Sequence, residues 1–217
     1  MFSRIGRAIK AFRARRFVII FSENENEADL AVPAQEIVAE SILFAARVAS
    51  GLLCLALPKK RLEELEIDTL PSKYRAYDTP FYTPVDAKEV EGSGISARDR
   101  AFTIRKVIDP NTKPSDLARP GHVTLLGAHA DGLIGRNGHT EAVVQLCQLA
   151  ELYPGGVLCE LVSDSGDMMT AKELKALARR FRIPIITVGA LAEFARSLLL
   201  PSKKDLTTKK NRGIVKL

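Results

Sequence analysis

Extended and helical patterns alternate along most of this 217-residue chain, and that alternation is the strongest constraint on its fold. Short apolar runs at Phe17–Phe21, Leu52–Leu57 and Val157–Val162 are typical of buried strands. Between them, apolar residues recur at helical spacing, as they do from Val38 to Ala49. The pattern predicts one α/β layered domain, although it does not determine the order or direction of the strands.

The remaining elements follow from the same two periodicities. Further strands are expected at 81–87, His122–Leu126 and Ile185–Val188. Further helices are expected from Ser96 to about Val107, from Gly138 to about Leu152, from Thr170 to Phe181, and in a last segment that runs to about Leu199. Pro58 should end the strand before it, and Thr170 with Glu173 should form a capping box.

The net charge of +6 is located at the two ends of the chain. Residues 1–16 carry six basic side chains and no acidic one, and residues 203–217 carry six basic side chains against one acidic. The body between them is therefore mildly acidic. A nucleic-acid-binding domain usually carries its positive charge on the folded body, so we expect no nucleic-acid partner.

The N-terminal segment admits two interpretations. It is rich in arginine and lacks acidic residues, as mitochondrial transit peptides do. It also places Phe2, Ile5, Ile9 and Phe12 on one stripe of a helix that leads directly into a strand. We favour an ordinary first helix within a domain of residues 1–200, followed by a basic tail at 201–217 that we expect to be disordered.

Cysteine usage and hydropathy indicate the compartment. Cys54, Cys147 and Cys159 lie far apart in apolar stretches, which favours reduced thiols over a disulfide framework or a zinc site. No apolar run approaches the roughly 20 residues that span a bilayer. We therefore expect a cytoplasmic protein that does not enter a membrane.

Three acidic residues alternate in the segment Glu25-Asn26-Glu27-Ala28-Asp29. In an extended chain, residues i, i+2 and i+4 share one face, so the three carboxylates would lie side by side. A cation would offset their repulsion, and Mg²⁺ prefers hard oxygen ligands while keeping several waters. The alternative is a solvated acidic loop after the first strand.

A second group of polar residues opens a helix at Arg136-Asn137-Gly138-His139-Thr140-Glu141. Backbone N–H groups at a helix N-terminus, with a flanking arginine and a threonine hydroxyl, can form a phosphate site. His139 at this position can ligate a metal or transfer a proton. A capped helix with a buried histidine is the alternative interpretation.

Two further segments carry weaker signals. Glu160 lies within a buried apolar strand, where a carboxylate is costly unless it is paired or ligated. The glycine-rich turn from Gly92 to Arg100, which includes Ser93 and Asp99, leads into a charged helix and could hold an anion. An ordinary ion pair and an ordinary loop explain these two segments equally well.

Taken together, these segments resemble the 3,4-dihydroxy-2-butanone 4-phosphate synthase family of riboflavin biosynthesis. The order and approximate spacing of the acidic segment, the Gly92–Arg100 turn, Arg119-Pro120-Gly121-His122-Val123, Arg136–Ala142 and Cys159-Glu160 match that family. The resemblance extends from the first helix to about Arg196. It implies an α+β (α/β layered), three-layer single domain with a mixed, twisted sheet.

The resemblance also implies a reaction and a homodimer with sites near the subunit interface. Members of this family are magnesium-dependent lyases that convert D-ribulose 5-phosphate into L-3,4-dihydroxy-2-butanone 4-phosphate and formate. By motif position, Glu25 and His139 correspond to ligands of Mg²⁺ or Mn²⁺. The catalytic carboxylates implied are Glu27, Asp29, Asp99 and Glu160. The substrate-binding residues implied are Asp29, Ser93, Asp99, Arg136, Asn137, Thr140 and Glu160.

Several positions depart from the family pattern. The acidic motif of the family reads Asp-Asp-x-x-Arg-Glu-Asn-Glu-Gly-Asp, and this chain has Ile20 and Phe21 for the two aspartates, Asn24 for the arginine and Ala28 for the glycine. Ser93 replaces a threonine, and Met169-Thr170 replaces an Ala-Arg pair. We expect a monofunctional synthase. The alternatives are a divergent paralogue that acts on another sugar phosphate and a catalytically silent binding or dimer partner.

Overall fold

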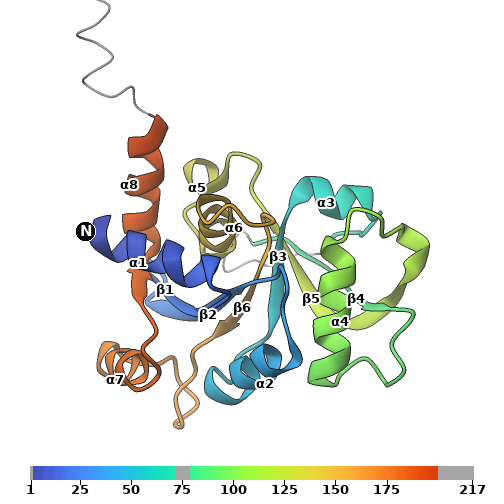
Figure 1. Cartoon of the computed structure of the whole chain (residues 1–217), viewed down its shortest axis with the longest axis horizontal. Coiled ribbons are helices and arrows are strands. Elements are labelled where there is room, and N and C mark those ends of the chain that lie inside the picture. The colour runs from blue at the N-terminus through green and yellow to red at the C-terminus, as the bar shows by residue number, and fades with distance from the viewer. Residues whose placement is uncertain (1, 72–78, 200–217) are drawn as a thin grey trace, which may run out of the picture.

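The computed structural model describes residues 2–71 and 79–199 and contains one mixed sheet of seven strands (Figure 1). The spatial order of the strands is β4-β5-β3-β6-β2-β1-β7. The strands are β1 (Val18–Ser22), β2 (Glu27–Pro33), β3 (Cys54–Pro58), β4 (Phe81–Ala87), β5 (Leu117–Ala128), β6 (Gly156–Glu160) and β7 (Ile185–Thr187). β1 with β7 and β3 with β5 are parallel pairs, whereas the other neighbours are antiparallel.

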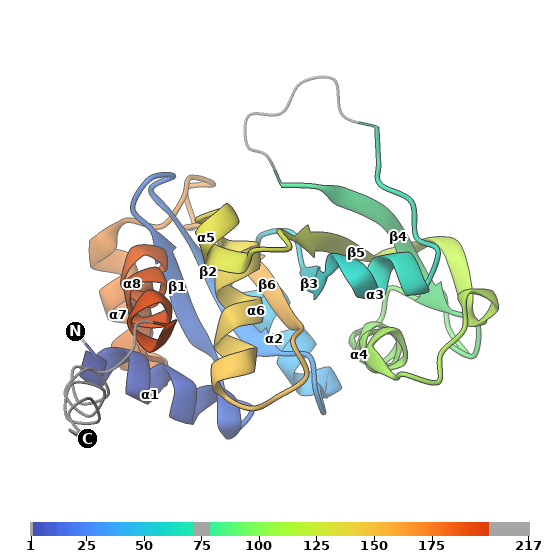
Figure 2. The ribbon, with the colours of Figure 1, turned by 90° about the horizontal axis from the view of Figure 1, so that it is seen from above.

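Helices cover both faces of this sheet, which gives the three layers that the family resemblance implies. The helices are α1 (Phe2–Arg13), α2 (Ala39–Val48), α3 (Lys59–Glu64), α4 (Ala97–Ile108), α5 (Gly132–Gly135), α6 (His139–Leu149), α7 (Ala171–Phe181) and α8 (Val188–Leu199). One apolar core lies beneath α2, α3, α4 and α7, and the other lies beneath α1, α6 and α8. Figure 2 shows β4 and β5 with α3 and α4 at one end of the sheet and α1, α7 and α8 at the other.

The strands reach both cores because their side chains alternate between the two faces. In β2, Leu30 and Val32 pack beneath α2 and α4, whereas Ala31 packs beneath α6. The same alternation turns Asp29 toward the α6 side. The position of that carboxylate is therefore a consequence of the packing of the strand that carries it.

Most of the expected elements are present, including the amphipathic first helix, in which Ile5 and Phe12 are buried. The capping box of α7 is also confirmed, since Thr170 and Glu173 exchange side-chain to backbone hydrogen bonds. No helix in the described part of the chain is long and apolar enough to cross a membrane. The expected basic tail at 201–217 lies outside the described residues.

The structure corrects two local expectations. Glu27, Ala28 and Asp29 begin a strand, so a fully solvated acidic loop is wrong for them. β5 begins at Leu117 rather than at His122, because its first half pairs with β4 alone, and a proline is tolerated where one side of a strand lacks a neighbour. The expected end of the strand at Pro58 is confirmed, and Pro58 is also the N-cap of α3.

The structure explains why residue 121, in the Arg-Pro-Gly-His segment, is a glycine. A Cβ atom at this position would overlap the backbone of Val85 and Asp86 on β4. The strands therefore approach closely only because residue 121 lacks a side chain. This close approach of β4 and β5 lies next to His122 in the middle of β5.

We predict that Gly121→Ala lowers the free energy of unfolding by about 1–3 kcal/mol, the usual cost of overpacking a tight site. Gly6→Ala is the matched control, because no atom lies within 4 Å of a Cβ atom there and alanine is favoured in a helix. Urea unfolding of the two variants gives the comparison. Equal stability of the two variants would contradict the close-approach argument.

Candidate functional site

A cluster of carboxylates lies where β2 and β6 run side by side. Asp29 is only 6% exposed and is paired in register with Glu160 on β6 and with Ile20 on β1. Residues that are directly opposite in an antiparallel pair have their side chains on the same face, so Asp29 and Glu160 are neighbours. Glu27 lies two residues before Asp29 and shares this face.

His139 brings an imidazole to the same cluster. It is the first residue of α6, and its Nδ1 atom lies 3.2 Å from Oε2 of Glu25 in the turn between β1 and β2. The Nε2 atom of His139 is buried and has no hydrogen-bond partner among the described residues. A buried nitrogen without a partner is costly and marks a position where a ligand is expected.

The charges of the cluster shift the pKa values of its members in opposite directions. Burial raises the pKa of Asp29 to about 7, with His139 opposing the shift and Glu160 adding to it. Burial and the charge of Glu25 also raise the pKa of Glu27. The hydrogen bond with His139 lowers the pKa of Glu25. Burial alone would lower the pKa of His139, but Asp29, Glu25 and Glu27 outweigh it and raise the pKa to about 9.

The donor set fits a hard divalent cation. Four carboxylates face one imidazole, so the cluster has an excess of negative charge that a cation would offset. In the described part of the chain, no three histidine, cysteine or acidic side chains are already arranged around a common metal position. Mg²⁺ typically takes one or two protein carboxylates and keeps several waters, which is compatible with few protein ligands here. Glu25 and the unpartnered nitrogen of His139 are the residues best placed to hold it.

Arg136 is held rigidly beside this cluster by Glu141. Its Nε atom donates to Oε2 of Glu141 at 2.8 Å, and its Nη2 atom donates to Oε1 at 2.7 Å. The Glu141 side chain is 0% exposed and also accepts a hydrogen bond from the backbone N–H of His129. A planar guanidinium with two parallel bonds to one carboxylate has a fixed orientation. Glu141 therefore determines where the positive charge of Arg136 points.

Glu160 is likewise held in place by the backbone around it. Its Oε2 atom accepts a hydrogen bond of 2.7 Å from the N–H of Leu52. Gly51 lies against the same carboxyl group, where a Cβ atom would come within 2.6 Å of the same oxygen. The buried-strand carboxylate is therefore hydrogen-bonded and has Asp29 as its neighbour across the strands.

Ser93 and Asp99 belong to a different part of the structure. Asp99 lies in the first turn of α4 and accepts a hydrogen bond from the N–H of Gly94, which has a φ of +93°. Gly94 packs against a pair formed by Asp86 and His122, whose Oδ2 and Nδ1 atoms are 2.6 Å apart. Among the described residues, no hydrogen bond or ion pair joins Ser93 or Asp99 to the carboxylate cluster.

The structure thus brings together most of the residues that the sequence indicated. Glu25, Glu27, Asp29, Glu160 and His139 form the cluster, with Arg136, exposed Asn137 and buried Thr140 at or just before the start of α6. Ser93 and Asp99 remain apart from it. Sequence reasoning did not single out Glu141 or the Asp86–His122 pair. For Glu141, the one available signal in the sequence was its spacing from Arg136 across the start of a helix.

Comparison with known proteins identifies the family of this chain. The family model described as 3,4-dihydroxy-2-butanone 4-phosphate synthase matches residues 6–194. The chain belongs to this family. A curated synthase from Sodalis glossinidius is 39% identical over 90% of this chain and 92% of that protein. A synthase from Pectobacterium carotovorum is 41% identical over 88% of this chain and 89% of its own length.

Solved structures of the family show the same fold. A synthase structure from Candida albicans is 38% identical, covers 88% of this chain and 96% of that chain, and superposes with a TM-score of 0.81. Another synthase structure, in complex with two magnesium ions, is 34% identical, covers 89% of this chain and 95% of that chain, and has a TM-score of 0.82. The second of these supports a divalent metal in the family.

We predict that Glu141→Gln lowers the free energy of unfolding by about 2 kcal/mol, because hydrogen bonds to charged groups contribute roughly 1.5–3 kcal/mol. The matched control is Glu151→Gln, since Glu151 forms an ion pair with Arg13 in which the side chains are 81% and 50% exposed. Exposed pairs contribute little, so the control should change stability by less than about 0.5 kcal/mol. Similar losses in both variants in urea unfolding would show that Glu141 does not hold Arg136 as described.

Proposed function

We propose that this chain converts D-ribulose 5-phosphate into L-3,4-dihydroxy-2-butanone 4-phosphate and formate, a lyase reaction of riboflavin biosynthesis. The homologues of the family support this activity and give no support to a different sugar phosphate or to a catalytically silent partner. The observation that carries the proposal is the cluster in which Glu25, Glu27 and Asp29 act on His139 and Glu160 lies beside Asp29, while the Nε2 atom of His139 is buried without a partner among the described residues. Release of formate from ribulose 5-phosphate in the presence of Mg²⁺ is the direct test.

Glu25 and His139 would hold the divalent cation, as Mg²⁺ or Mn²⁺. When bound, such a cation supplies polarisation of carbonyl and enediol oxygens. Glu25 lies 3.2 Å from Nδ1 of His139, which places its carboxylate beside the imidazole and leaves Nε2 as the ring nitrogen that would ligate the ion. Removal of either side chain should therefore remove the cation as well as turnover.

Glu27, Asp29 and Glu160 would hold and move protons as the enediol forms and the carbon skeleton rearranges. Asp29 and Glu160 are adjacent across two strands, so one can hold a proton while the other remains ionised. The hydrogen bond from the Leu52 N–H holds one oxygen of the Glu160 carboxyl group on the β3 side of β6. The family resemblance also implies a catalytic role for Asp99, which lies in the first turn of α4 apart from this group.

The substrate phosphate would bind at the start of α6. Backbone N–H groups at this helix end, the guanidinium of Arg136 and the hydroxyl of Thr140 have the chemistry for an anion, and Asn137 can add an amide. Ser93 would complete the grip, with Asp99 ordering the loop around Gly94. Because Arg136 is fixed by Glu141, the phosphate would meet a preorganised partner.

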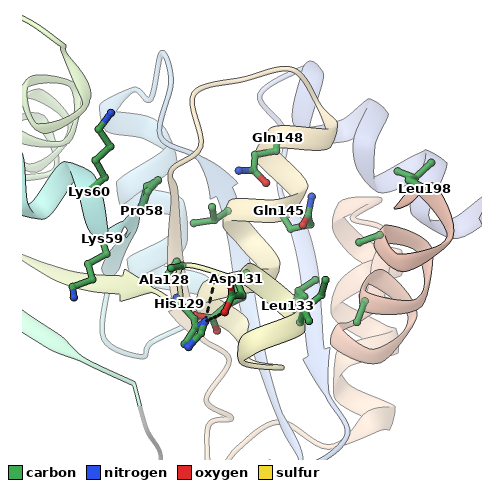
Figure 3. A pocket seen from close by; sticks show the side chains of 17 residues that line it. Pro58, Lys59, Lys60, Ala128, His129, Asp131, Leu133, Gln145, Gln148 and Leu198 are labelled. Atoms are coloured by element: carbon green, nitrogen blue, oxygen red, sulfur yellow. Dashed lines mark hydrogen bonds and ion pairs between the residues drawn. The ribbon is translucent and has the colours of Figure 1, made fainter. Parts of the chain in front are cut away.

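We also propose a cytoplasmic homodimer. Ile134 and Leu198 are 62% and 60% exposed, an unusual cost for large apolar side chains. They line a cavity of about 610 Å³ near the loop that carries Arg136. Figure 3 shows Leu133, Gln145, Gln148 and Leu198 around this cavity. A second copy that covered this surface would lie close to the helix that begins with His139.

Sedimentation velocity tests the dimer. We predict a particle of twice the 23.8 kDa mass of the chain for the wild type, and a shift toward the monomer for the double variant Ile134→Glu and Leu198→Glu. Leu43→Glu, at an exposed apolar position on α2, is the matched control and should remain dimeric. A wild type that sediments as a monomer at micromolar concentration would reject the proposal.

The metal requirement gives a second prediction. Activity should disappear in excess EDTA and return with Mg²⁺ or Mn²⁺. His139→Ala and Glu25→Ala should each lower kcat by far more than tenfold and abolish Mn²⁺ binding measured by electron paramagnetic resonance. Glu23→Ala is the control, because Glu23 is an exposed carboxylate in the same turn. A rate within about tenfold of wild type, or roughly 1.4 kcal/mol in barrier, would remove that residue from the proposed metal site.

The last prediction concerns Asn24, which is exposed in the turn beside Glu25 and replaces the arginine of the family pattern. Asn24→Arg should raise kcat/KM for ribulose 5-phosphate by about tenfold, because a charge-assisted hydrogen bond to the substrate phosphate typically contributes roughly 1.5–3 kcal/mol. Glu23→Arg places the same charge one residue earlier and should not reproduce the gain. An unchanged or lower kcat/KM for Asn24→Arg would exclude the simple missing-arginine account.

A further inference from the structure

Two rows of basic side chains line opposite sides of a groove at the β7 end of the sheet. The residues that carry these side chains are far in sequence from those that begin α6. The groove has a volume of about 640 Å³ and is lined by residues of α1, α7 and the segment that follows α7. Its charged lining residues are Arg4, Arg7, Lys10, Arg16, Lys175, Arg179 and Arg182. Among residues 2–71 and 79–199, no acidic side chain lines it.

The spacing of these residues fixes the direction in which they point. Arg4, Arg7 and Lys10 follow one another at intervals of three along α1, which places them on one side of the helix. On α7 and its C-terminal cap, Lys175, Arg179 and Arg182 follow at intervals of four and three. Each helix therefore contributes a row of cations to the same groove.

These cations have no partners within the described part of the chain. None of the seven forms an ion pair or a side-chain hydrogen bond there, although Arg13 and Arg15 on the same N-terminal segment are both paired with glutamates. Favourable interactions with the helix dipoles explain the placement of only some of these cations. Cations stabilise a helix C-terminus, which suits Arg179 and Arg182, but Arg4 lies in the first turn of α1, where a positive charge is unfavourable.

An aromatic pocket continues from the groove. It has a volume of about 250 Å³ and shares Arg16, Arg182 and Pro184 with the basic lining. Its other walls include Phe17, Phe44 and Phe181, which are only partly buried. The ring centres of Phe17 and Phe44 are 4.9 Å apart, and those of Phe44 and Phe181 are 5.1 Å apart. The rings present an apolar surface next to concentrated positive charge.

We propose that the groove and the aromatic pocket together bind a nucleoside triphosphate, with the phosphates among the cations and the base against the phenylalanines. Together the two cavities are within the size range of small-molecule sites. The aromatic pocket would hold a flat ring such as a nucleotide base, and inorganic phosphate has no such ring. A membrane surface fits less well, because the apolar residues Ile5 and Phe12 of α1 are buried in the core and do not face a bilayer.

This site is separate from the carboxylate cluster but is linked to it through the sheet. β7 supplies Ile185 to the groove, and it pairs in parallel with β1. In turn, β1 pairs with β2, where Ile20 lies opposite Asp29. A ligand that fixed the position of β7 would therefore act on the strand that leads into the turn of Asn24 and Glu25.

Isothermal titration calorimetry on the full chain tests the proposal, with ATP, GTP, inorganic triphosphate and adenosine as the probes. We expect at least one nucleotide to bind at micromolar concentration. Inorganic triphosphate should bind at least about tenfold more weakly, because it cannot stack on an aromatic ring. Binding should persist in the His139→Ala variant, since the groove shares no residue with the carboxylate cluster.

Charge reversal locates the binding. The double variant Arg7→Glu and Arg179→Glu should weaken nucleotide binding at least tenfold, and Lys172→Glu, exposed on α7 but outside the groove, should bind within about twofold of wild type. If the double variant unfolds, Arg7→Gln and Arg179→Gln replace it. Phe44→Leu should reduce nucleotide binding but leave triphosphate binding unchanged.

Four results would overturn the proposal. The first is that neither nucleotide binds, and the second is that inorganic triphosphate binds as tightly as the nucleotides. The third is that the charge-reversed variant binds nucleotide as tightly as wild type does. The fourth is that an oligouridylate binds in a salt-sensitive way and the nucleotides do not bind. The second result would indicate a general anion groove, and the last would indicate a nucleic-acid surface. Each readout is a binding constant, so the test stands whether or not the chain turns over ribulose 5-phosphate.

Discussion

Repulsion between the buried carboxylate of Asp29 and the partly buried carboxylates around it is the constraint on which this site depends. Asp29 and Glu160 lie on adjacent strands with their side chains on one face, and Glu25 and Glu27 lie close by. Desolvation increases the cost of each negative charge. The structure offsets this cost with the imidazole of His139 and with a backbone N–H directed at Glu160. A divalent cation between the carboxylates and the unpartnered nitrogen of His139 would offset most of the remainder.

The departures from the family pattern fall at positions that the fold accommodates. Ile20 is buried on the α6 side next to Asp29, where an apolar neighbour contributes to the burial that raises the pKa of that carboxyl group. Ala28 lies in a regular strand, and it is not among the described residues with positive φ, so a glycine is not required there. Asn24 is exposed and lies in the turn. Of these substitutions, the one at Asn24 is the most direct change to chemistry near the substrate.

Charge is strongly segregated in this molecule. Acidic side chains gather where β2 and β6 meet the start of α6, whereas basic side chains gather between α1 and α7. The two regions suit opposite ligands, a cation with a sugar phosphate at the first and a polyanion at the second. The net charge of +6 hides this division, because it averages over both regions and over the basic tail.

Local spacing in the sequence was enough to predict the elements that carry the site. The two-residue period placed Glu27 and Asp29 on one face, the capping box located the start of α7, and the motif at Arg136–Glu141 located the start of a helix. These features depend on residues within a few positions of one another, so a single segment contains the information. The proximity of these segments in the fold depended on the family resemblance rather than on periodicity.

Only the tertiary structure decided which distant residues meet. The β2–β6 register, which places Glu160 beside Asp29, is set by packing across the whole sheet, because a shift of one residue would turn both side chains to the other face. The Asp86–His122 pair and the groove between α1 and α7 likewise join residues that are far apart in the chain. No local pattern encodes such contacts, because their geometry depends on how the helices and strands pack. The sequence by itself determined which groups carry the chemistry, and the packing of the sheet and helices decided where those groups act.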